Sequence, residues 1–142
     1  MADQLTEYLR VRQGPQPDTV SRNAWLEAIR SLYADIRSWL SEPEREGLVQ
    51  IVDADKAITE RLLGTYDAPV LQLLFADQQV VIVPVARYVL GGGGRVDMTL
   101  GPRSFMLLWE GDAWQILPRD KKSSPSALNK DAFSEALQVL LG

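Results

Sequence analysis

The chain has 142 residues and a formal net charge of −4, and it contains neither cysteine nor histidine. These absences exclude disulfides, thiolate metal ligands, a cysteine nucleophile, a Ser-His-Asp triad and a histidine proton shuttle. With 46% hydrophobic and 24% charged residues the composition is that of an ordinary globular domain, and no pattern predicts a catalytic centre, a metal site or a cofactor.

The N-terminal residues 3–12 predict a short helix, with Leu5, Tyr8 and Leu9 on one side. Glycine and prolines follow directly and end this helix. Because short isolated helices are marginal, we expect residues 1–17 to form a loosely attached N-terminal segment.

A longer helix is predicted from Ser21, a suitable N-cap, to Ser41, with Val20 and Trp25 placed to form a hydrophobic staple. Ser41 and Glu44 match a capping box, which predicts one further helical turn. Spacings of three and four along the long helix give one apolar stripe, formed by Trp25, Ile29, Leu32, Tyr33, Ile36, Trp39 and Leu40.

The pattern changes to that of strands after residue 47. Residues 48–52 form a β-like run, whereas residues 58–66 suit a strand and a helix equally. Pro84 lacks an N–H group and predicts an edge position or a bulge. Further strands, paired as antiparallel hairpins, are expected at residues 70–75, 79–85, 95–100, 105–109 and 114–117.

The C-terminal part begins with a polar segment, residues 120–127, that predicts a loop. A last helix follows, with Asn129 as N-cap and with Leu128 and Phe133 as a second staple. We therefore expect one α+β domain over residues 1–142. It combines an N-terminal amphipathic helix, an antiparallel meander sheet of about five or six strands and a C-terminal helix, with the helices packed on the sheet.

A run of four glycines is the most unusual feature of the sequence. Exposed backbone N–H groups and a following arginine suit a phosphate or a carboxylate, but a plain connection between strands is the favoured interpretation. The run matches neither the Walker pattern nor the dinucleotide-binding pattern. A ligand site here would use Gly91, Gly92, Gly93, Gly94, Arg95 and Asp97.

Several carboxylates lie close together in the sequence. Asp53, Asp55 and Glu60, together with Asp97, have the ligand chemistry for a hard cation such as Mg²⁺ or Ca²⁺. Their spacing does not match the EF-hand loop, so we interpret this cluster as part of a solvated turn and expect no metal.

The strand predicted around Leu107 is apolar on both faces. Phe105, Leu107 and Trp109 share one face, while Met106 and Leu108 share the other. Such a strand needs cover on both sides, and an uncovered side would be an apolar patch of the kind that marks a protein interface. The candidate interface residues are Met106, Leu108, Trp109 and Trp114.

The segment Gly94-Arg95-Val96-Asp97-Met98 follows a strand with Pro84 and the glycine run, and Leu63 to Pro69 precede it. Residues 63–100, with the closing helix that contains Phe133, resemble a family of small uncharacterised bacterial proteins. The resemblance implies a bacterial origin and a self-contained fold. That family has no established activity, so it supplies no catalytic residues.

Localisation and partners follow from charge and hydropathy. The polar N-terminus lacks the features of a secretory signal, and the apolar runs are too short to span a bilayer, so we expect a cytoplasmic protein without a membrane partner. The short basic cluster at residues 119–122 has no interleaved aromatic residue, which argues against nucleic-acid binding.

Two functions stay open. The first is a non-enzymatic protein-interaction module, an accessory subunit or an immunity- or antitoxin-like binder of a bacterial multiprotein system. Its partner would be another protein or a second copy of the chain. Because the chain is acidic, a basic partner is favoured. The second is a small-ligand or nucleotide-binding domain that uses the glycine-rich loop and Arg95.

Overall fold

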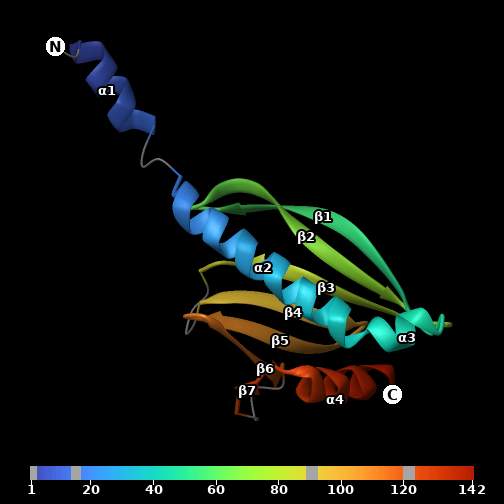
Figure 1. Ribbon diagram of the computed structural model, residues 1–142. Helices are drawn as coiled ribbons and strands as arrows, with labels where there is room; N and C mark the ends of the chain where they lie inside the picture. Colours follow the sequence, from blue (N-terminus) through green and yellow to red (C-terminus); the bar gives the residue numbers. More distant parts are fainter. Residues whose placement is uncertain (1–2, 14–16, 89–92, 120–123) are drawn as a thin grey trace.

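The computed structural model describes residues 3–13, 17–88, 93–119 and 124–142 (Figure 1). Within these ranges helices come first, then strands, then a last helix, as the sequence predicts. The helices are α1 (Gln4–Gln13), α2 (Thr19–Trp39), α3 (Ser41–Arg45) and α4 (Lys130–Leu141). The strands are β1 (Gln50–Glu60), β2 (Gly64–Leu74), β3 (Gln79–Ala86), β4 (Gly94–Leu100), β5 (Arg103–Glu110), β6 (Ala113–Pro118) and β7 (Ser126–Ala127).

The strands form one antiparallel meander. Each strand pairs with the next one along the chain, so the order across the sheet is β1-β2-β3-β4-β5-β6-β7. Gly101 and Gly111 take φ values of 60° and 61° in the tight turns before and after β5, a conformation that favours glycine. The predicted α+β fold is therefore confirmed. The short β7, which pairs with Gln115 and Ile116, lies in the segment predicted to be a loop.

The helix α2 begins earlier than predicted. The Asp18 carboxylate is its N-cap and accepts hydrogen bonds from the backbone N–H of Ser21 at 3.0 Å and from the Ser21 hydroxyl at 2.7 Å. Ser21 therefore lies in the first turn, and its prediction as the N-cap is wrong. Val20 is 79% exposed, so the predicted staple with Trp25 does not form. The buried stripe is confirmed at Trp25, Ile29, Leu32, Tyr33 and Ile36.

The further helical turn predicted after α2 is present as α3. Its N-cap position is Leu40, and no side chain caps it, so the capping box of Ser41 and Glu44 does not form. The reason is that α2 continues into α3 almost without a break, which leaves Ser41 inside the helix. Gly47, with φ of 74°, closes this segment before the sheet begins.

The strands β1 and β2 are longer than the sequence predicts, and they pair along their full lengths. The ambiguous residues 58–66 are the end of one strand, a turn and the start of the next. Asp53 and Asp55 lie within β1, so their interpretation as a solvated turn is wrong. Because β1 is an edge strand of the sheet, its polar side chains reach water without interrupting the pairing.

The helix α2 is tied to the sheet where β2 and β3 separate. These strands pair only from Leu71 to Leu74, opposite residues 79–82. The Tyr33 hydroxyl donates to the carbonyl oxygen of Pro69 at 2.8 Å, and the carbonyl oxygen of Ile82 lies 3.2 Å away. A helix side chain thus donates to backbone acceptors at the point where the pairing of β2 with β3 ends. Burial raises the pKa of Tyr33 far above its usual range.

The bulge predicted at Pro84 and the N-cap predicted for α4 are confirmed. The register of β3 against β4 shifts between Pro84 and Ala86, so the proline occupies a bulge in an inner strand. The Asn129 side chain accepts the backbone N–H of Ala132 at 2.8 Å and caps α4.

One hydrophobic core lies between the sheet and the helices α2 and α4. Trp39 of α2 and Phe133 of α4 join the two helices, with ring centroids 5.4 Å apart. In the described part of the chain, no helix combines the length and the hydropathy needed to cross a membrane.

Candidate interaction surface

The sheet presents two different faces, and α2 and α4 pack on one of them, here called the helix face. At the end of this face near the start of α2, Trp25 stacks on Trp109 with ring centroids 5.7 Å apart, and it contacts Trp114 in a tilted arrangement with centroids 6.0 Å apart. Gly94 lies directly under the Trp25 ring, and the register places it opposite Trp109. The aromatic side chains of this hairpin therefore belong to the covered side of the molecule.

The opposite side of the sheet, here called the open face, consists of three rows of residues that pair directly across neighbouring strands. Residues paired across an antiparallel ladder point to the same side. The first row is Val52, Gln72, Val81, Thr99 and Ser104, the second is Val83, Asp97, Met106 and Leu117, and the third is Arg95, Leu108 and Gln115.

The open face has an apolar centre. Three of the four members of the second row, Val83, Met106 and Leu117, are apolar, and Leu108 adjoins them in the third row. Every member of the three rows is buried or half-buried, because adjacent side chains shield one another. Among the described residues no helix packs over this face, since the core cluster that contains α2 and α4 lies on the other side.

One ion pair lies within this apolar surface. The Arg95 guanidinium binds the Asp97 carboxylate in a bidentate manner, with Nε to Oδ1 at 2.8 Å and Nη2 to Oδ2 at 3.0 Å. Their side chains are only 23% and 11% exposed. The hydrogen bond to Asp97 raises the pKa of Arg95, although burial acts in the opposite direction. The pair is electrically neutral, so the three rows carry no net charge.

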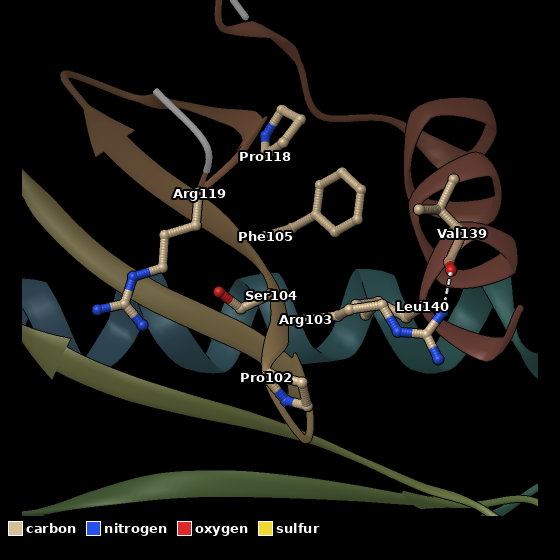
Figure 2. A pocket seen from close by; sticks show the side chains of 8 residues that line it. All are labelled: Pro102, Arg103, Ser104, Phe105, Pro118, Arg119, Val139 and Leu140. Carbon is tan, nitrogen blue, oxygen red and sulfur yellow. Dashed lines mark hydrogen bonds between the residues drawn. The ribbon is translucent and has the colours of Figure 1, made fainter. Parts of the chain in front are cut away.

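Two hollows flank Phe105 where α4 meets the ends of β5 and β6. One, of about 520 Å³, is lined by Phe105, Pro118 and Val139 together with Arg103 and Arg119. Figure 2 shows Arg103 reaching toward α4, where its Nη1 donates to the carbonyl oxygen of Val139 at 3.2 Å, while Arg119 points away from the helix. Arg103 therefore donates to a backbone carbonyl group in the last turn of α4. The second hollow, of about 500 Å³, lies beside Leu117 and Ala136.

The structure describes only part of the predicted ligand-binding loop. Gly91 and Gly92 lie outside the described residues. A Cβ at Gly93 would meet the backbone oxygen of Trp109 at 2.1 Å, and one at Gly94 would meet the Trp25 ring at 2.1 Å. Close packing therefore explains both of these glycines, and Asp97 already engages the arginine of the proposed site.

The four predicted interface residues do not form one patch. Met106 and Leu108 lie on the open face, whereas Trp109 and Trp114 lie on the helix face with Trp25. The cause is the two-residue period of a strand, which separates Trp109 from its neighbour Leu108.

The sequence did not predict a hydrogen-bond network that lies beside Trp25, at the end of the sheet near the start of α2. The Glu60 carboxylate accepts the backbone N–H groups of Arg87 at 3.0 Å and Tyr88 at 3.2 Å, and it also accepts the Tyr66 hydroxyl. The Trp25 indole N–H donates to the Tyr66 oxygen at 3.2 Å. Burial, with Glu60 adding to it, raises the pKa of Tyr66 well above its usual range. Three of these bonds join residues 27, 28 and 41 positions apart, so the network links distant parts of the chain.

Three of the four carboxylates considered for a cation, Asp53, Glu60 and Asp97, have other partners. Asp53 pairs with Arg37 of α2 at 2.6 Å, and Asp97 is bound to Arg95. Within the ranges that the structure covers, no group of three or more potential metal ligands comes together.

Comparison with known proteins places this chain in no group: no family model, no curated protein and no solved structure matches it. The resemblance of residues 63–100 to small bacterial proteins stays a prediction.

Proposed function

We propose that this chain is a non-enzymatic interaction module that binds a protein chain through its open face. A single observation supports this proposal: both packed helices lie on one side of a sheet whose other side has an apolar centre. Antiparallel sheets that face water on one side normally alternate apolar and polar residues. Here β5 places Met106 and Leu108 on the side that none of the described helices covers, where a partner would remove them from water.

The Arg95–Asp97 pair fits the same role. A neutral, bidentate pair adds little net attraction, but it penalises a partner that leaves either group without a hydrogen bond. An apolar surface with one such pair at its centre therefore suits selective binding of a complementary protein surface.

The class of partner follows from charge. With a net charge of −4, the chain attracts a basic protein over distance, which increases the association rate. We propose a bacterial multiprotein system as the setting, in which the chain acts as an accessory subunit or as an immunity- or antitoxin-like binder.

The test is affinity capture with two matched double variants. Met106→Gln with Leu108→Gln removes apolar surface from the open face without adding charge. Leu48→Gln with Leu62→Gln makes the same kind of change at residues that are 62% and 50% exposed elsewhere. Tagged wild-type protein and both variants are incubated with extract of the source organism, and the bound proteins are quantified by mass spectrometry.

We expect a stoichiometric partner with the wild-type and control proteins and at least about a tenfold loss with the open-face variant, as removal of two buried apolar contacts predicts. Equal recovery with both variants would show that the open face is not the binding surface. Circular dichroism of each variant confirms that the fold is retained.

A further inference from the structure

The helix α1 is a second unpartnered apolar surface in the same chain. Residues 4–12 of α1 are all exposed, including Leu5 at 60%, Tyr8 at 59% and Leu9 at 49%. These three side chains recur at spacings of three and four and so form one stripe. Figure 1 shows α1 standing clear of the sheet. A ten-residue helix is marginally stable alone in water, so its stripe requires a surface to pack on.

We propose that α1 packs on the open face of a second copy of this chain. This inference rests on the proposed function, because it names the partner of that face. Each copy supplies one apolar stripe and one apolar face that no described helix covers. A twofold exchange satisfies both copies at once and closes the assembly as a dimer.

Size and charge support this occupant. Ten helical residues are about 15 Å long, and the four strands β3 to β6 are about 14 Å across between their outer axes. The helix carries Glu7, Arg10 and Arg12, a formal charge of +1, so the rest of the chain carries −5. The charge of α1 is thus opposite in sign to that of the body on which it would pack.

The start of α2 determines where α1 leaves the body. The Asp18 N–H donates to the carbonyl oxygen of Leu62 at 2.8 Å, and Pro17 lies against Gly64. The chain is therefore attached to the turn between β1 and β2, at one end of the sheet. From this point α1 is positioned to extend to a neighbouring molecule, as it does from the body in Figure 1.

The first experiment is light scattering after size exclusion, over a dilution series of the full chain. We expect twice the mass of one chain at high concentration. Leu5→Glu and Leu9→Glu should each raise the dimer dissociation constant at least about tenfold, because each introduces a charge into a buried apolar stripe. Val11→Glu is the matched control: Val11 is 78% exposed and lies off the stripe on the same helix.

A second experiment identifies which copy supplies the helix. The chain has no native cysteine, so single cysteines report specific contacts. Protein with Leu9→Cys is mixed with protein carrying Leu108→Cys and oxidised. We expect a disulfide-linked pair of the two variants, and much less product when Val11→Cys replaces Leu9→Cys.

Three outcomes would overturn this inference: a monomer at every concentration, a dimer that Leu5→Glu and Leu9→Glu leave intact, or a monomer that sediments with anionic vesicles through the stripe. The proposed function is tested separately. If Met106→Gln with Leu108→Gln abolishes capture of another protein while the α1 variants do not, the open face binds a partner other than α1. If neither set of variants changes any association, both proposals fail.

Discussion

At the scale of single residues, the glycine run shows how packing determines composition. Gly94 is buried beneath Trp25, whose indole N–H is fixed by a hydrogen bond to Tyr66. A side chain at this position would occupy the volume of a ring that has no space to move. The glycine that suggested a ligand loop is needed for a close approach of β4 to α2.

We predict that Gly94→Ala destabilises the fold by about 2–3 kcal/mol, because its Cβ would lie 2.1–2.7 Å from three atoms of the Trp25 ring. The control is Gly101→Ala. Gly101 has a φ of 60° and no atom near its Cβ position, so it should cost only about 1 kcal/mol in backbone strain. Urea unfolding followed by tryptophan fluorescence measures both values. Equal losses would mean that the ring moves aside and that packing does not require this glycine.

The candidate site shows at this scale what sequence can and cannot predict. Arg95 and Asp97 are two apart in a strand, so the period of two places them on one face, and their pairing could have been predicted. The bonds from Glu60 to the backbone of Arg87 and Tyr88 could not, because they join residues 27 and 28 positions apart. Only the pairing of the whole sheet brings these residues together.

At the scale of elements, strands were predicted best where turn residues separate them. The hairpin of β5 and β6 was predicted closely because Gly111 and Asp112 mark the turn. Residues 58–66 stayed ambiguous because their local propensities are mixed, and pairing along the full lengths of β1 and β2 decided the outcome. Similarly, Asp18 and Ser21 both suit an N-cap, and the position of the preceding chain against Leu62 selects Asp18.

The contact of α2 with the separated strands β2 and β3 gives a prediction on pH. The pKa of Tyr33 is raised by burial, so the folded state retains its proton above pH 10, where the unfolded chain loses it. The unfolded state then binds fewer protons than the folded state, and stability falls as the pH rises above about 10. Urea titrations at about pH 8, 10 and 11, which lie below, at and above the usual tyrosine pKa, measure this loss.

Tyr33→Phe should lower stability by about 1–2 kcal/mol at neutral pH, because the carbonyl oxygens of Pro69 and Ile82 lose their donor. It should also reduce the alkaline loss of stability. Tyr8→Phe is the matched control, since Tyr8 is 59% exposed, and it should change neither quantity. If the loss of stability at alkaline pH is unchanged in Tyr33→Phe, groups other than Tyr33 cause this loss, and Tyr66 is the next candidate.

At the scale of the whole molecule, the two faces of the sheet have different roles. The helix face holds the core, whose side chains stabilise the fold whether or not a partner is bound. The open face contributes less to the stability of one chain because most of its side chains are only half-buried. The sequence already showed that β5 is apolar on both faces, but the side on which both helices pack depends on the tertiary structure.

Two adjacent leucines of β5 test this division directly. Leu107 is fully buried on the helix face, and Leu108 is half-buried on the open face. Leu107→Ala should destabilise the chain by about 2–5 kcal/mol, as other large-to-small core changes do. Leu108→Ala should cost about 1 kcal/mol, since less apolar area returns to water.

Association should show the reverse order. In the folded state Leu107→Ala keeps the open face intact and should bind as the wild type does, whereas Leu108→Ala should weaken binding about tenfold. Urea unfolding at a concentration where the chain is monomeric gives the first comparison, and a dilution series followed by light scattering or partner titration gives the second. Equal stability losses for the two leucines would mean that the open face is covered within one chain, which would remove the physical basis for binding there.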